Sequence, residues 1–154
     1  MRRLAGYPRG FYGSLILIFF ALISTGLLLI PNMLMMRLDM DIEFGVSGGA
    51  RLSSAAIHCT SAFLSMLIIG AISTVHIRAG VHRNQNIVTG FSLLTLCLVS
   101  LFSAVGLYYF GDEALSIGSS VVHTGSGLLI LLLIFWHGIS GHIIHNRRYG
   151  LSQK

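Results

Sequence analysis

Residues 121–142, VVHTGSGLLILLLIFWHGISGH, decide the fold class of this chain. They belong to an uncharged stretch at 114–146, which exceeds the roughly 20 residues needed to cross a hydrocarbon core about 30 Å thick. Yet the segment contains three histidines: His123, His137 and His142. Titratable side chains inside a membrane are costly and usually mark a functional site. The segment therefore indicates a membrane helix with a chemical role.

The charged residues of the chain are segregated from its apolar stretches. Only 10% of the 154 residues are charged, against about 25% in soluble domains, and they cluster between long apolar stretches. This pattern predicts an all-α membrane protein, an up-down bundle of four transmembrane helices at about 10–36, 52–78, 86–110 and 116–145, in one integral domain over 1–154. The N-terminal apolar run has no small-residue cleavage site after it, so we expect an uncleaved first helix.

The basic residues predict the orientation. Eight of the ten lie near the N-terminus, in the segment 78–83 or near the C-terminus, whereas the other side has Arg37, Arg51 and all five acids. The positive-inside rule then places both termini in the cytoplasm, and the second and fourth helices run in the same direction. We expect a multi-pass protein of the bacterial cytoplasmic (inner) membrane, surrounded by lipid. Topology accounts for the net charge of +5 without nucleic acid.

The two halves of the chain share a weak internal repeat. It pairs SSAAIH at 53–58 with SSVVH at 119–123, and TGLLLIP at 25–31 with VGLYYFG at 105–111, so that Gly26 aligns with Gly106. Such a repeat is typical of a bundle built as two helical hairpins. The first outer loop, about 37–51 and rich in glycine, is expected to be the main difference between them.

The seven histidines lie only in the second and fourth predicted helices or at their inner ends. In an ideal α-helix, His58 and His76 share a face and are about 27 Å apart along the axis. His123 and His137 are about 21 Å apart and within about 40° of a common face. Two parallel helices therefore present one histidine pair near each membrane surface.

This arrangement matches the chemistry of bis-histidine haem ligation. A b-type haem takes two neutral imidazoles, one from each of two helices. We expect an outer haem between His58 and His123 and an inner haem between His76 and His137, with His142 as the alternative to His137. The chain has no C-x-x-C-H motif, which excludes covalent c-type attachment.

Several other residues are expected to surround these haems. Small residues would line the space for the porphyrins: Ser61, Ser65, Gly70, Gly125, Ser126 and Gly127, with Gly26 and Gly106 near the outer haem. Arg51 is expected to meet the outer propionates, and the inner propionates would meet Arg78, Arg83 or Arg147. His82 and His145 lie beside arginines at the inner boundary, where we expect them to be solvated.

Three short motifs of the chain also occur in a known family: the H-x13-H spacing of His123 and His137, the Thr-Gly after His123, and TGLLL in the first helix. The chain resembles the di-haem cytochrome b subunits that anchor periplasmic dehydrogenases, such as formate dehydrogenase and hydrogenase, to the quinone pool. By this resemblance His123 and His137 match the ligands of the fourth helix, and His58 matches the outer ligand of the second.

The fourth ligand departs from the family pattern. Several members take it from the first helix, which has no histidine here, or from a second-helix histidine thirteen or fourteen residues after the first. Ala71 and Ile72 occupy those places in this chain. His76 is the available substitute, and His142 competes with His137 as its partner.

The resemblance implies a membrane cytochrome that passes electrons between quinone and a redox partner subunit, an iron-sulfur protein or a c-type cytochrome. Substrate chemistry is expected on that partner, because the chain is accounted for by membrane helices.

Two other functions stay open. Intramembrane histidines also bind transition metals and relay protons, although metal transporters usually add carboxylates or Cys/Met clusters. Here Cys59 beside His58 is the only close His/Cys pair. The third possibility is a membrane anchor subunit without a cofactor.

Overall fold

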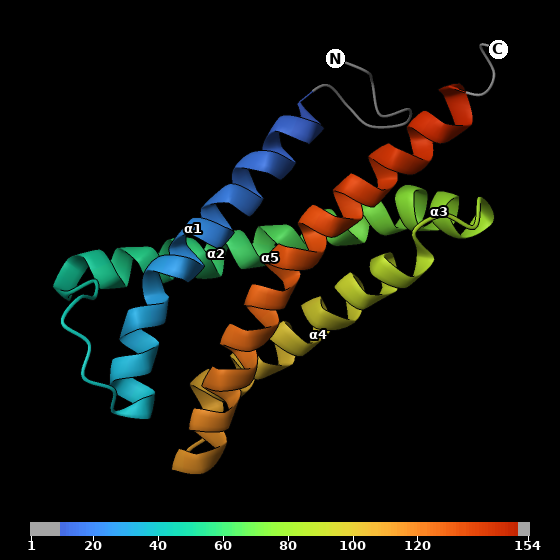
Figure 1. Ribbon diagram of the computed structural model, residues 1–154. Coiled ribbons are helices and arrows are strands. Elements are labelled where there is room, and N and C mark those ends of the chain that lie inside the picture. Colours follow the sequence, from blue (N-terminus) through green and yellow to red (C-terminus); the bar gives the residue numbers. More distant parts are fainter. Residues whose placement is uncertain (1–9, 151–154) are drawn as a thin grey trace. The chain divides into compact units, whose positions relative to one another are not determined.

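The computed structural model describes residues 10–150, with side chains described up to residue 144. The chain forms α1 (Phe11–Leu38), α2 (Gly48–Ile72), a π-helix (Ser73–Ile77), α3 (Arg78–His82), α4 (Ile87–Tyr109) and α5 (Glu113–Gly150) (Figure 1). Within these described residues, four helical segments are long and apolar enough to cross a membrane: Phe11–Leu38, Gly48–His82, Ile87–Tyr109 and Glu113–Ile144. The predicted all-α fold with four membrane-length helices is confirmed.

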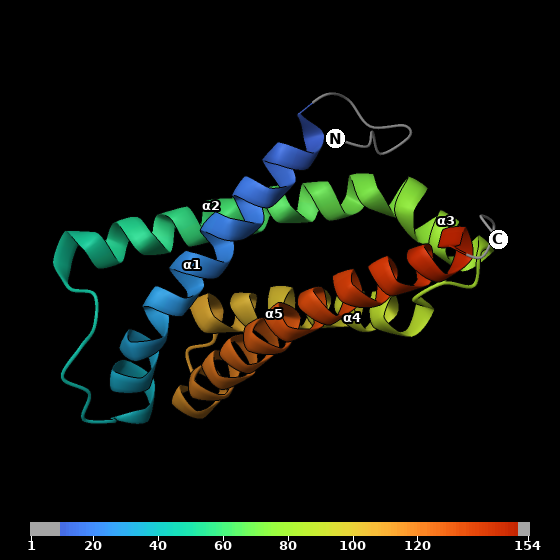
Figure 2. The ribbon, with the colours of Figure 1, turned by 45° about the horizontal axis from the view of Figure 1, so that its top comes forward.

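The described chain divides into two compact units, one ending at His76 and the other beginning at Ile77. In the first hairpin α1 crosses and packs against α2, and in the second hairpin α4 runs beside α5 (Figures 1 and 2). Each helix of a pair is joined to the other by a short connection, so both pairs are antiparallel. The two hairpins correspond to the two halves of the predicted repeat.

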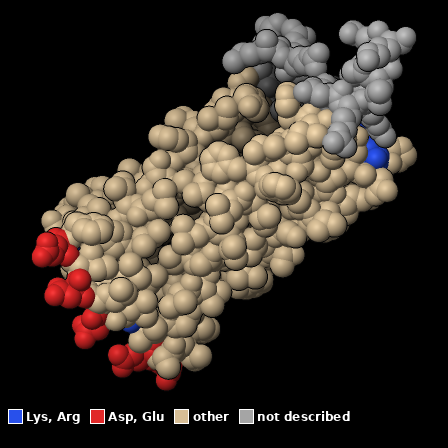
Figure 3. Space-filling view, viewed as in Figure 1, with Lys and Arg blue, Asp and Glu red and all other residues tan. Residues whose placement is uncertain are grey.

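Both hairpin interfaces are built from small side chains. Within the described part of the chain no large apolar side chain is buried, and the buried polar ones are Thr25, Ser61, Ser65, Ser103, Ser116, Ser120 and Ser126. Lipid tails are as apolar as leucine, so membrane helices gain little by burying leucine against each other, and small residues allow their backbones to approach closely. The large apolar residues point outward instead, and Figure 3 shows helix flanks without charged atoms on the visible face.

The first outer loop is shorter than predicted. α1 continues to Leu38 and α2 begins at Gly48, so the loop covers 39–47 and not 37–51. Asn32 stabilises this tight return: its Nδ2 donates to Val46 O at 2.8 Å, and Val46 N donates to its Oδ1 at 3.1 Å. These two bonds attach the loop backbone to the side of α1.

The second membrane helix is not a continuous α-helix over 52–78 as predicted. Ser73 Oγ donates to Gly70 O at 2.6 Å and Thr74 Oγ1 donates to Ala71 O at 2.9 Å, just where the π-helix begins. Hydroxyl groups that bond to nearby carbonyls compete with the regular backbone ladder, and the π-helix closes wider i→i+5 turns. The ideal-helix calculation that placed His76 on the face of His58 therefore does not apply.

Candidate functional site

His58 is held against α1 through one ring nitrogen. It lies ten residues after the start of α2, about 15 Å along the axis. Its Nδ1 is 3.1 Å from Leu22 O and 3.3 Å from Thr25 Oγ1. A carbonyl oxygen only accepts, so Nδ1 carries the proton and, in the neutral ring, Nε2 carries the lone pair. The Thr25 hydroxyl donates to Ala21 O at 2.6 Å, which leaves its oxygen to accept from the ring.

His123 is held in the same manner in the second hairpin. It also lies ten residues after the start of its helix, and its Nδ1 is 2.9 Å from Ser100 O and 3.4 Å from Ser103 Oγ on α4. The proton is again on Nδ1, and the lone pair of the neutral ring is on Nε2. His58 and His123 therefore lie equally far from the starts of their own helices, as predicted, but about 15 Å along them, deeper than the predicted place near the helix start.

The two hairpins thus repeat one hydrogen-bonding pattern. In each, a backbone carbonyl and a hydroxyl three residues later meet Nδ1: Leu22 with Thr25, and Ser100 with Ser103. This correspondence aligns Gly26 with Ala104. This pairing is shifted by two residues from the sequence alignment, which paired Gly26 with Gly106.

His137 is attached to the first turn of α4. Its Nδ1 is 2.8 Å from Thr89 Oγ1, and the Thr89 hydroxyl donates to Asn86 O at 3.1 Å. The Asn86 side chain in turn donates to His137 O at 3.4 Å. Because His123 and His137 both bond to α4, the two rings lie on the same side of α5, as their spacing predicted.

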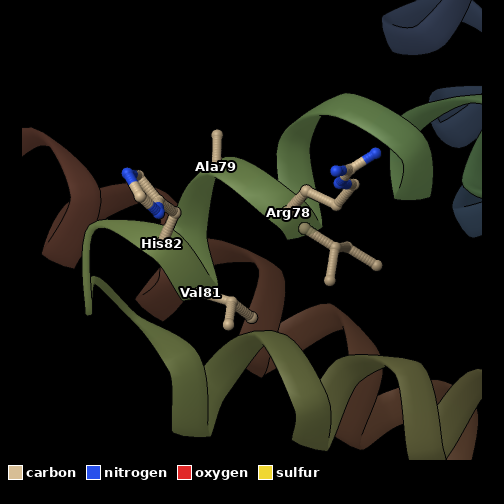
Figure 4. Close-up of a pocket in the computed structure, with 5 residues that line it drawn as sticks. Arg78, Ala79, Val81 and His82 are labelled. Atoms are coloured by element: carbon tan, nitrogen blue, oxygen red, sulfur yellow. The ribbon is translucent and has the colours of Figure 1, made fainter.

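The remaining candidate histidines differ in exposure. His58, His123 and His137 are half-buried, whereas His76, in the π-helix, and His142, near the end of α5, are exposed. His82 is exposed as well and lies, with Arg78, along an open groove of about 510 Å³ beside α3, which Ile77, Ala79 and Val81 complete. Figure 4 shows Arg78 and His82 projecting from the two ends of α3. The side chains of His145 and Arg147 lie outside the described residues.

Gly26 and Gly106, which were predicted to lie near the outer haem, each pack closely against a side chain of their own hairpin. A Cβ at Gly26 would lie 3.0 Å from Cε1 of His58, and a Cβ at Gly106 would meet the Ser119 hydroxyl and lie 2.8 Å from Cε2 of Phe110. Both glycines therefore serve close packing inside their own hairpins.

Ser126 also faces its own hairpin. Its hydroxyl is 2.7 Å from Ser100 Oγ and donates to His123 O at 3.0 Å, so it joins the polar network around His123 instead of lining an open space. Ser61 and Ser65 are buried, and Ser65 Oγ has no hydrogen-bond partner.

Three predicted glycines do present open faces. A Cβ at Gly70, Gly125 or Gly127 would meet nothing within 4 Å. Gly127 follows His123 by four residues, which places it one turn along on the same side of α5. The open face at Gly127 therefore lies near His123 on α5.

Arg51 lies in the first turn of α2, after the acidic loop. Its Nη1 donates to the thioether sulfur of Met36 at 3.0 Å, in an exposed position. The predicted contacts of Arg51 and Arg78 with propionates stay predictions.

Sequence reasoning missed the partners of the histidines. Thr25, Ser103 and Thr89 come from the two helices that contain no histidine, so the pattern of histidines does not reveal them. The available signal was a hydroxyl residue beside or near a glycine in an otherwise apolar helix, as in Thr25-Gly26 and Thr89-Gly90.

No family model, curated protein or solved structure was found to match this chain. Among the described side chains, no three or more His, Cys, Asp or Glu residues form a group that could hold a metal ion. Any function for the histidines must therefore be argued from their own geometry.

Proposed function

We propose that the protein is a di-haem b-type cytochrome of a bacterial cytoplasmic membrane, passing electrons between the quinone pool and a redox partner subunit. One observation carries this proposal. His58 and His123, each ten residues after the start of the second helix of its own hairpin, each direct Nδ1 to a backbone carbonyl of the neighbouring helix.

This geometry is what an imidazole ligand needs. A metal-binding histidine usually coordinates through one nitrogen while the other donates its proton to a carbonyl, carboxylate or water, which fixes the tautomer and the ring orientation. The carbonyls of Leu22 and Ser100 do this for His58 and His123, so each neutral ring has its lone pair on Nε2. A histidine kept only as a packing residue would not require the same tautomer in both hairpins.

The residues present fit a haem. When bound, haem b supplies an iron atom that gains or loses one electron, at a potential set by its axial ligands and their hydrogen bonds. The protein's part is to offer two neutral imidazoles per iron and space for the macrocycle. The open face at Gly127 provides such space beside His123.

The second haem would lie toward the other end of the hairpins. His137 is favoured over His142 as its ligand, because His137 is half-buried and its Nδ1 is held by Thr89. His76 is the proposed partner ligand. Arg51 and Arg78 would meet propionates of the outer and inner haem respectively.

The quinone and the partner belong to the same proposal. His123 and His137 are about 21 Å apart along α5, so two haems at these levels would carry electrons across most of the membrane. A partner with an iron-sulfur cluster or a c-type haem would exchange these electrons and perform the substrate chemistry.

Haem analysis of the purified protein tests the proposal. We expect a Soret band, a reduced α-band and two non-covalent haems per chain. His123→Ala should remove one haem and leave the other, whereas the matched change His82→Ala, at an exposed histidine, should remove neither. A colourless protein that is stable without haem would refute the cytochrome. A colourless protein that binds zinc or copper would support the transporter instead.

A further inference from the structure

We infer that Thr25-Gly26 in α1 and Thr89-Gly90 in α4 are seats for imidazole rings, in which the threonines act as positioning residues that set the potential of the bound iron. This inference rests on the proposed haem function. It explains why the two helices without histidines contain Thr-Gly dipeptides inside apolar sequence.

The two seats have the same construction. Thr25 Oγ1 is 3.3 Å from Nδ1 of His58, and Thr89 Oγ1 is 2.8 Å from Nδ1 of His137. The glycine that follows each threonine lies against Cε1 of the same ring: a Cβ there would be 3.0 Å from Cε1 of His58 and 3.7 Å from Cε1 of His137. Threonine therefore meets the nitrogen of each ring, and glycine makes room for the adjacent carbon.

Each threonine oxygen is prepared to accept the ring proton. The Thr25 hydroxyl donates to Ala21 O at 2.6 Å, and the Thr89 hydroxyl donates to Asn86 O at 3.1 Å. With its own proton engaged, the oxygen offers lone pairs to an Nδ1–H donor. The proton on Nδ1 in turn directs the lone pair to Nε2, the nitrogen that would bind iron.

The hydrogen bond at Nδ1 also affects the iron electronically. An acceptor that takes a hydrogen bond from Nδ1–H raises the basicity of the imidazole as a ligand. This would favour the oxidised state of a bound iron, because hydrogen bonds to ligands are among the factors that set haem potentials. Loss of a threonine hydroxyl should therefore raise the potential of the haem that its histidine binds.

The two seats differ in how much depends on threonine. Nδ1 of His58 also lies 3.1 Å from Leu22 O, a fixed acceptor that remains when Thr25 is changed. The Thr89 hydroxyl makes a closer contact with its ring, at 2.8 Å against 3.3 Å for Thr25. We therefore expect the larger effect at His137.

Paired substitutions test this inference in the full-length protein. Thr89→Val, which keeps the shape but removes the hydroxyl, should raise the midpoint potential of one haem and leave the other unchanged. Thr25→Val should raise the potential of the other haem by less. Thr25→Ser and Thr89→Ser keep the hydroxyl and should match the parent. Ser120→Ala is a further control, because this fully buried serine bonds to Ser116 O within α5.

A second measurement does not require haem. The 15N spectrum of labelled histidine reports whether Nδ1 is protonated and hydrogen-bonded, and Thr89→Val should shift the Nδ1 signal of His137 whereas Thr89→Ser should not. Unchanged potentials in both valine variants with two haems bound would overturn the inference but not the cytochrome. If the protein binds no haem, the proposed function fails. An unshifted His137 signal in Thr89→Val would then also refute the hydrogen bond between Thr89 and His137.

Discussion

Gly26→Ala is expected to destabilise the first hairpin through a single contact. The added Cβ would lie 3.0 Å from Cε1 and 3.4 Å from Nδ1 of His58, whereas carbon atoms in contact prefer about 3.5–4.0 Å. The ring would have to move by about 0.5 Å, and its bonds to Leu22 O and Thr25 Oγ1 oppose that shift. Overpacking of this kind costs about 1–3 kcal/mol.

Gly90→Ala is the matched control. Its Cβ would be 3.7 Å from Cε1 of His137, an ordinary contact distance. Replacing a glycine inside a helix by alanine stabilises the helix by about 0.5–1 kcal/mol. Both substitutions have this effect, so it cancels when their melting temperatures are compared. At about 2–4 °C per kcal/mol for a chain of this size, a difference of about 2 kcal/mol places the melting temperature of Gly26→Ala about 4–8 °C below that of Gly90→Ala.

Thermal unfolding of the purified protein in detergent measures this difference, and a double mutant identifies its source. In a His58→Ala background the clash partner is gone, so Gly26→Ala should no longer destabilise. Such non-additivity is the signature of residues in direct contact. Equal melting temperatures for Gly26→Ala and Gly90→Ala, or an unchanged effect of Gly26→Ala without His58, would refute the ring contact.

Three further substitutions test other parts of the structure. Asn32→Leu removes both bonds to Val46 and should cost about 1–3 kcal/mol locally, seen as faster amide exchange over 40–47; unchanged exchange would mean that the loop is held by other contacts. Ser126→Ala removes the bond to Ser100 and, at about 0.6 kcal/mol for a membrane hydrogen bond, should lower the melting temperature by only about 1–2 °C. The Cβ that Gly127→Leu adds would meet nothing within 4 Å, so helicity by circular dichroism should be unchanged while one haem is lost. Retention of both haems would place the outer haem away from Gly127.

The four membrane helices were predictable because their energetics depend on composition and length alone. A stretch of uncharged residues long enough to cross the hydrocarbon core must satisfy its backbone internally, and an α-helix does so. The loop boundary was not predictable in the same way. Gly48 and Gly49 are typical loop residues, but the pairing of Asn32 with Val46 shortens the loop and includes them in α2.

The site was predicted in part for a similar reason. The matching depth of His58 and His123 follows from counting along a helix. The partners of their rings depend instead on the register between two helices, which periodicity does not specify. The π-helix was also missed. Ser73 and Thr74 bond to carbonyls of their own helix, but serine and threonine do not make such bonds in every helix, so their presence in the sequence does not predict a π-helix.

The nature of the partners explains why polar residues alone would not have revealed the site. A helical carbonyl has a second lone pair beyond the one used by the backbone ladder, so any residue type can supply the acceptor for a histidine on a neighbouring helix. Leucine does so at position 22 and serine at position 100. What the orienting helix must provide is close approach, and Gly26 beside Thr25 provides it. In a membrane hairpin, a helix that orients a histidine is therefore marked by a small residue beside or near a hydroxyl residue, whereas the backbone carbonyl that accepts the hydrogen bond leaves no trace in the sequence.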